Sequence, residues 1–108
     1  MAELGANGVE AHVGGGVNDD GVFVLDLGGQ LDVSNFEAVR SKVDALLSAD
    51  PRSVVVDLGS LSFMDSSGIA LLVGIGNRVD HLRVRNPTPI VRRIIELCGL
   101  ADAVGLQV

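Results

Sequence analysis

The chain has 108 residues and a formal net charge of −6, and its hydrophobic content of 47% is that of a globular protein rather than a disordered one. This length predicts one domain, spanning residues 1–108, with a modest core built from aliphatic side chains. The acidic charge and the scarcity of aromatic residues argue against a basic groove with stacking platforms, so no direct nucleic-acid partner is expected.

Three other classes of protein are also excluded by simple patterns. Every apolar run is interrupted by Asp, Arg or Gly, so no membrane span is expected, and the N-terminus lacks the features of a signal peptide. His12, His81 and Cys98 stand at no ligand spacing, so neither a metal site nor a cofactor is predicted. A single cysteine cannot form an internal disulfide, and a cytoplasmic protein is the expectation.

The first third of the chain predicts a pair of strands. Residues 1–8 are expected to be frayed, and residues 9–13 alternate weakly as an edge strand does. The Gly-, Asn- and Asp-rich residues 14–21 predict a loop, and residues 22–27 form the first well-defined strand. These two strands are expected to form an antiparallel hairpin at one side of a sheet.

The next segment, 34–50, predicts an amphipathic helix. Ser34 and Glu37 have the spacing of a capping box, in which each side chain bonds the other residue's backbone N–H. Apolar residues follow at helical spacing, at positions 36, 39, 43, 46 and 47.

The second half alternates strands and helices. Residues 53–58 form a continuous apolar run that suits a central strand covered on both faces, and 81–85 alternate like a strand. One helix is expected from Ser66 to about Gly76 or Asn77, and another from Thr88 and Pro89 to Gly99. Residues 103–108 suggest a last short strand. The order predicts an α/β fold with a mixed, mostly parallel sheet of four to five strands and three to four helices.

Polar side chains follow two strands that are expected to be neighbours. The loop 28–35 contains Asp32, and the loop after 58 ends in Asp65, Ser66 and Ser67. Because ligands bind beyond the carboxyl ends of such strands, these four residues are expected to lie together. At a helix N-terminus the free N–H groups and the dipole favour an anion.

A plain helix cap is one interpretation of this joint, since Asp65 or Ser66 could serve as N-cap. The helix that follows favours a second one. Its sequence, GIALLVGIG, is apolar on every face, and a small domain has little room to bury such a helix completely. An exposed apolar strip beside Ser66 indicates a protein-binding patch, and a phosphate there would add nearly two negative charges.

The segment VVVDLGSLSFMDSSGIALLVG, residues 54–74, resembles the STAS domain of bacterial anti-sigma factor antagonists, also called anti-anti-sigma factors. The segments VFVLDLGGQLDVSN and NPTPIVRRIIELCGL resemble two further parts of that domain, so the resemblance extends over residues 9–106. It implies a small α/β domain that regulates transcription in a stress response by protein–protein interaction. The connection 76–87 is a few residues short for this family.

The resemblance also implies a mechanism and a set of residues. Ser66 would be phosphorylated by a cognate anti-sigma factor, itself a serine kinase, and a metal-dependent serine phosphatase would remove the phosphate. The unphosphorylated form would bind the anti-sigma factor and free the sigma factor. The chain is then a substrate and not an enzyme. The docking site around Ser66 would consist of Asp32, Asp65, Ser67 and Gly68, with Ile69 and Leu72 on the apolar helix.

Three alternatives remain open from the sequence. A phosphoaspartate receiver would use Asp57, but the acidic pair after a first strand and a late lysine are absent. A hydrolase would use Ser66 or Ser67, but the first glycine of G-x-S-x-G is missing and neither His12 nor His81 has an evident route to the serines. A STAS-like domain could also be a phosphorylation-independent scaffold or a subunit of a lipid transporter.

Overall fold

The computed structural model describes residues 2–6 and 9–106, which form one sheet and three helices. The elements are β1 (Ala2–Ala6), β2 (Val9–Val17), β3 (Phe23–Leu31), α1 (Phe36–Leu46), β4 (Ser53–Met64), α2 (Ser66–Arg78), β5 (His81–Arg85) and α3 (Pro89–Leu97). None of the helices in these residues is long and apolar enough to cross a membrane.

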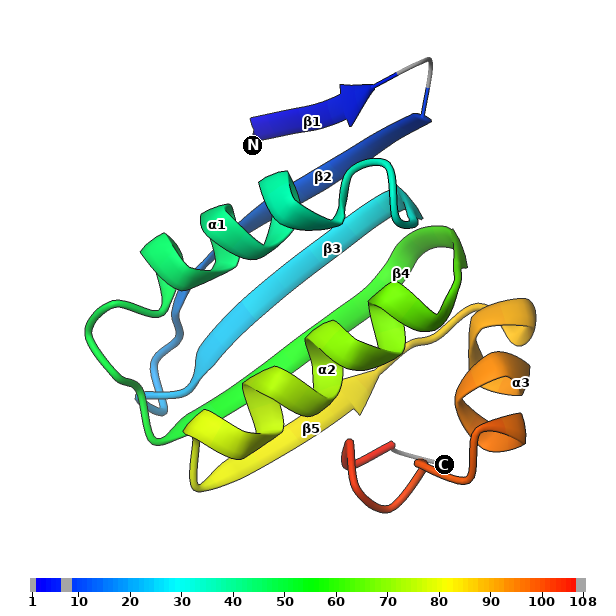
Figure 1. The fold of residues 1–108 in the computed structure, drawn as a ribbon. Helices are drawn as coiled ribbons and strands as arrows, with labels where there is room; N and C mark the ends of the chain where they lie inside the picture. The colour runs from blue at the N-terminus through cyan, green and yellow to red at the C-terminus, as the bar shows by residue number, and fades with distance from the viewer. Residues whose placement is uncertain (1, 7–8, 107–108) are drawn as a thin grey trace.

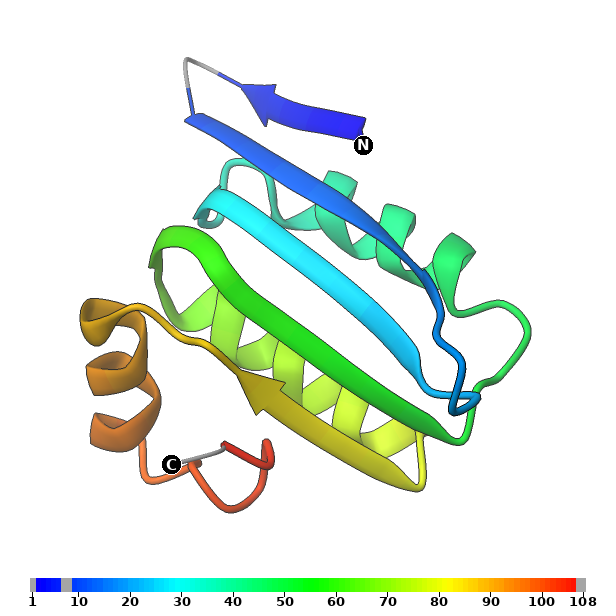
Figure 2. The ribbon, with the colours of Figure 1, turned by 180° about the vertical axis from the view of Figure 1, so that it is seen from behind.

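The five strands lie in the sheet in the same order as in the chain. β1, β2 and β3 pair antiparallel, whereas β3, β4 and β5 pair parallel. Helices α1 and α2 cover one face of the sheet (Figure 1), and the view from behind shows the strands β2 to β5 uncovered on the other face (Figure 2). The predicted fold class, a mixed sheet of four to five strands with helices, is confirmed.

The core lies between the sheet and the helices and is aliphatic apart from Phe23 and Met64. Along β4, Val54, Val56 and Leu58 are buried against the helices, while Val55 and Asp57 between them are only half-buried. The prediction that this strand is covered on both faces was therefore wrong. An apolar run of this kind needs only one helical layer when the residues on its second face are a valine and an ion-paired aspartate.

Three strands are longer than the sequence predicted, because glycine and serine residues within them resemble loop residues. Residues 2–6 form β1 instead of being frayed, and residues 1 and 7–8 lie outside the described part. β2 continues through Gly14–Gly16, which pair with β3, so the predicted loop begins only at Asn18. β4 continues to Met64 because register shifts opposite Gly28 and Gln30 absorb the extra residues.

The helix ends agree with the predictions to different degrees. The capping box was wrong, because α1 begins after Asn35 and the Ser34 hydroxyl donates to Asp32 instead. In α3, Thr88 and Pro89 stand at the expected N-cap and first position, and Gly99 has a positive φ of 70°. The Thr88 hydroxyl donates to the Leu61 carbonyl instead of capping the helix, while the Thr88 carbonyl accepts from the Arg92 N–H.

Two predicted boundaries shift only slightly. α2 runs to Arg78, so two residues suffice to connect it to β5, which accounts for the short connection seen in the sequence. The predicted last strand amounts to one bridge between Leu106 and Val84, and residues 107–108 lie outside the described part.

Candidate functional site: the N-terminus of α2

The carboxyl ends of β3 and β4 lie side by side and bring two acidic residues together. Leu31 pairs with Met64 at the ends of the two strands, and Asp32 and Asp65 are the next residues in the chain. The Asp65 N–H donates to the Leu31 carbonyl at 3.1 Å, which fixes the start of α2 to the end of β3. The expected meeting of the two loops is observed.

Asp65 is the N-cap of α2. Its carboxylate accepts a hydrogen bond from the Ser67 N–H at 2.8 Å, and its carbonyl accepts from the N–H groups of Gly68 and Ile69 at 3.0 and 3.4 Å. The N–H groups of Ser67, Gly68 and Ile69 are thus already bonded. The expectation of free N–H groups at this helix end was wrong for these three residues.

Ser66 is exposed, and its hydroxyl makes no hydrogen bond with any residue that the structure describes. Because Asp65 performs the capping, the Ser66 side chain has no structural task at the helix start. Ser67 is half-buried beside it. Of the two serines, Ser66 therefore has the more accessible hydroxyl.

The loop after β3 is held rigidly by Asn35, which is only 2% exposed. Its side chain accepts from the Asp32 N–H at 3.1 Å and donates to the Gln30 carbonyl at 2.8 Å. The Asp32 carboxylate accepts from the hydroxyl and, at 2.8 Å, from the N–H of Ser34. These bonds, the hydroxyl first, lower the pKa of Asp32, so this carboxylate stays ionised at neutral pH.

The outward face of α2 differs from the apolar strip that the sequence suggested. Ser66, Ala70 and Gly74 are exposed at successive i, i+4 positions, so the face is made of small residues. Ile69 and Leu72, which were predicted to contact a partner, are 8% and 1% exposed and belong to the core. Their side chains support the surface from beneath.

Gly68 is also buried, and it permits close packing of α2 on β4. A Cβ atom at this position would lie 2.7 Å from the Met64 Cβ and 2.8 Å from its sulfur. The glycine therefore sets how closely the first turn of α2 approaches the strand that precedes it. Sequence reasoning placed Gly68 at the docking site, and the structure places it directly under Ser66's turn.

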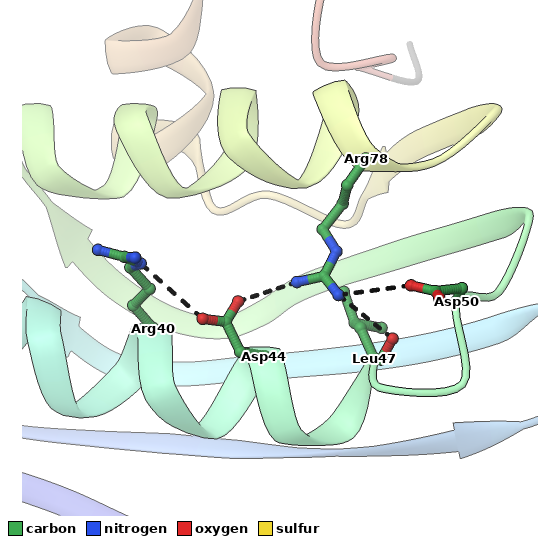
Figure 3. Close-up of polar contacts among 5 residues, drawn as sticks. All are labelled: Arg40, Asp44, Leu47, Asp50 and Arg78. Carbon is green, nitrogen blue, oxygen red and sulfur yellow. Dashed lines mark hydrogen bonds and ion pairs between the residues drawn. The ribbon is translucent and has the colours of Figure 1, made fainter.

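A groove of about 340 Å³ runs between α1 and α2, next to Ala70 and Gly74. Arg78 spans this groove at the C-terminal end, where its guanidinium donates to Asp44 at 2.9 Å and to the Leu47 carbonyl at 3.4 Å (Figure 3). Asp50 lies 3.8 Å from the same group. The sequence did not single out Arg78, because residues 34 positions apart meet only once the sheet has formed.

Asp57, the acceptor in the receiver alternative, is engaged on the uncovered face of the sheet. Its carboxylate accepts from the Gly59 N–H at 2.8 Å, Arg85 at 3.0 Å and Asn86 at 3.1 Å. Burial raises the pKa of Asp57, but the three hydrogen bonds and the Arg85 charge together outweigh burial and leave the pKa below its usual value. This carboxylate joins β4 to the end of β5.

The histidines of the hydrolase alternative lie away from the serines. His81 pairs with Ser53 at the start of β4, whereas Ser66 lies two residues beyond Met64, the last residue of β4. His12 pairs with Gly28 and lies in β2. Neither arrangement brings a histidine to the Ser66 end of α2.

Comparison with known proteins shows the family to which the chain belongs. The STAS domain profile matches residues 17–107, which is most of the chain. The chain belongs to the STAS domain family. The anti-sigma F factor antagonist of Lysinibacillus sphaericus is 33% identical over 82 residues, covering 71% of this chain and 70% of the relative. The resemblance inferred from the segment around Ser66 is confirmed.

Two solved structures share the STAS fold of this chain. An anti-sigma factor antagonist from Mycobacterium paratuberculosis superposes with a TM-score of 0.81 at 25% identity, covering 89% of this chain and 84% of that one. The unphosphorylated form of the anti-sigma factor antagonist SpoIIAA superposes with a TM-score of 0.73 at 25% identity, covering 89% and 86%.

Proposed function

We propose that this STAS domain is an anti-sigma factor antagonist and that Ser66 is its phosphorylated residue. The proposal rests on one observation above all. Asp65 caps α2, which leaves the adjacent Ser66 hydroxyl exposed and without a hydrogen-bond partner among the described residues. The names of the relatives support the regulatory role, because the similar proteins are antagonists of anti-sigma factors.

The docking surface of this proposal consists of residues 28–35, which are the end of β3 and the loop after it, and the exposed face of α2, with Ser66, Ala70 and Gly74. Small side chains on that face allow the backbone of a partner to approach closely. Asp32 and Asp65 lie at one end of the surface, next to Ser66. Ser67 borders the surface, while Gly68, Ile69 and Leu72 shape it from within the core.

A phosphate on Ser66 would act on the partner rather than on the fold. The first-turn N–H groups of Ser67, Gly68 and Ile69 are already bonded to Asp65, so the helix has few donors left for the new oxygens. The added charge of nearly −2 would stand beside the carboxylates of Asp32 and Asp65. Phosphorylation then changes the docking surface from neutral hydroxyl to dense negative charge and releases the partner.

The chain is the substrate in this cycle. A serine-kinase anti-sigma factor transfers the γ-phosphoryl group of ATP to the Ser66 oxygen, with loss of the hydroxyl proton. A serine phosphatase later hydrolyses the ester and restores the binding form. Unphosphorylated protein holds the anti-sigma factor, so the sigma factor is free.

The test combines phosphorylation and binding. The protein is incubated with ATP and each candidate anti-sigma kinase of its genome, and intact mass with site mapping is recorded. One added phosphate on Ser66 is expected, absent in Ser66→Ala and retained in Ser67→Ala. Binding of the anti-sigma factor should persist in Ser66→Ala in the presence of ATP and weaken in Ser66→Asp.

The opposite outcomes select a different function. If no kinase modifies the protein, or if Ser66→Ala and Ser66→Asp bind equally well, the phosphorylation switch is wrong. A stable partner recovered under those conditions would instead support a phosphorylation-independent STAS scaffold or a transporter-associated subunit.

A further inference from the structure

The face of the sheet opposite to α1 and α2 is uncovered in Figure 2. We call it the open face and define it by Gly14 and Gly16 of β2, Val24 and Asp26 of β3, Val55 and Asp57 of β4, and Arg83 and Arg85 of β5. Strand register places these residues in two rows across the sheet, one from Gly16 to Arg83 and one from Gly14 to Arg85.

The centre of the open face is apolar. Val24 pairs with Val55, and both side chains are half-buried although no helix covers them. Neighbouring valines on a sheet face of a globular protein commonly pack on a second layer, at a spacing of about 10 Å. The centre of the open face therefore resembles the apolar centre of an interface, and the layer that would cover it is absent from the described part of the chain.

The two sides of the open face differ in charge and in size. Arg83 and Arg85 project from β5, whereas β2 contributes only Gly14 and Gly16, with Asp26 next to them on β3. Arg85 is paired with Asp57, but Arg83 and Asp26 make no ion pair with any other residue in the described part of the chain. The face thus has a bulky cationic side on β5 and a flat anionic side on β2 and β3.

We propose that the open face binds a second copy of this chain. A two-fold axis parallel to the strands, between β3 and β4, places β5 of one copy over β2 of the other and Val55 over Val24. Arg83 of each copy then lies over Gly16 of the other and reaches its Asp26. The long arginine side chains occupy the space that the glycines leave open, and the contact occurs twice by symmetry.

A second copy places the cationic side of the open face over the anionic side, with the Arg85–Asp57 ion pair over Gly14 and Asp26. A purely acidic partner would match Arg83 but would be repelled by Asp26, and a basic partner would meet the reverse conflict. The valine pair across the axis is also self-complementary. The inference goes beyond the proposed function, because Ser66 is the first residue of α2, and α2 covers the other face of the sheet (Figure 1), so Ser66 stays accessible in the dimer.

The test is sedimentation equilibrium of the full chain from micromolar to millimolar concentration. The wild type should show a monomer–dimer equilibrium. Arg83→Glu and Asp26→Arg should each weaken dimerisation by about tenfold or more, since each replaces two attractive contacts by repulsive ones. An equimolar mixture of the two variants should restore it as a heterodimer, because both charge pairs are then opposite again.

Matched controls separate this surface from general charge effects. Arg93→Glu on α3 makes the same charge change as Arg83→Glu and should leave the dimerisation constant unchanged. Gly16→Arg should abolish the dimer without harming the fold, because a Cβ at Gly16 meets no atom within 4 Å. All these variants should be phosphorylated at Ser66 like the wild type, so the dimer and the phosphorylation switch fail or succeed independently.

Two results would overturn the proposal. A wild type that stays monomeric over the whole range shows that a second copy does not cover the open face. A dimer that is insensitive to Arg83→Glu, Asp26→Arg and Gly16→Arg uses another surface.

Discussion

Because Asp65 caps α2 and the Ser66 hydroxyl does not, substitutions at these two adjacent residues should differ in their effect on stability. In Asp65→Ala the 2.8 Å hydrogen bond to the Ser67 N–H is lost, and so is the negative charge at the helix N-terminus. Loss of an N-cap costs about 1 kcal/mol, and the charge–dipole interaction adds about 0.3–1 kcal/mol. We expect the free energy of unfolding to fall by about 1–2 kcal/mol.

Ser66→Ala removes a hydroxyl that bonds to no described residue, and alanine has the better helix propensity. Its effect should lie within about 0.5 kcal/mol of zero or be slightly stabilising. Asp65→Asn is the matched control, because asparagine keeps the capping oxygen and loses only the charge. Its cost should fall between those of the other two variants.

Urea unfolding followed by far-UV circular dichroism measures these differences, since the chain contains no Trp or Tyr to serve as a fluorescent probe. A loss of 1 kcal/mol corresponds to about 4–8 °C in the melting temperature of a domain near this size. If Ser66→Ala proved as destabilising as Asp65→Ala, the hydroxyl would be structural. The argument that it is free for phosphorylation would then be refuted.

Three further outcomes follow from packing and charge. Arg78→Ala should lower the free energy of unfolding by about 1–2 kcal/mol in urea titrations, because Arg78 joins α2 to α1 through Asp44 and the Leu47 carbonyl. Arg40→Ala, whose ion pairs are 3.9 Å long, should lower it by less than about 0.5 kcal/mol. Equal losses would contradict this role of Arg78. Gly68→Ala should lower the free energy of unfolding by about 1–3 kcal/mol, because the new methyl group would overlap Met64 of β4. Gly74→Ala should raise it by about 0.5–1 kcal/mol, because a methyl group there meets no atom within 4 Å and alanine favours the helix. The reverse order of melting temperatures would disprove the packing argument. Because the pKa of Asp57 is lowered in the folded state, the stabilisation by its carboxylate is complete above the unfolded pKa of about 4 and is lost as the pH falls through the folded pKa. The free energy of unfolding of the wild type, relative to that of Asp57→Asn, should therefore decline below about pH 4. A difference between the two proteins that stays constant from about pH 7 to about pH 3 would show that folding does not stabilise the carboxylate.

The sequence predicted the fold class and the location of the site because both depend on short-range signals. Alternation of apolar strands and helical stripes indicated the α/β layering, and Asp65 followed by two serines indicated a helix start at the end of a strand. The meeting of Asp32 with that helix start followed from parallel pairing of the two strands.

The errors arose where tertiary pairing overrides local preference. Gly59, Ser60 and Ser62 look like a loop, yet the irregular register with β3 accommodates them within one strand. Ser34 has the spacing of a helix cap, but its hydroxyl donates to the Asp32 carboxylate instead. The burial of Leu72 was not visible in a helix that is apolar all round, because periodicity cannot choose which face of such a helix contacts the sheet.

The agreement between chain order and sheet order has a consequence for how the protein assembles as it leaves the ribosome. The antiparallel hairpin of β2 and β3 needs only a short turn, and each later strand adds to the growing edge after one helix has crossed over. No strand has to insert between two strands that are already paired, so each newly synthesised strand pairs with the edge strand of a sheet that has already formed. Growth at that edge ends when Leu106 pairs with Val84 and the Val84 N–H donates to the Gly105 carbonyl, which caps part of the last template before another chain can extend it.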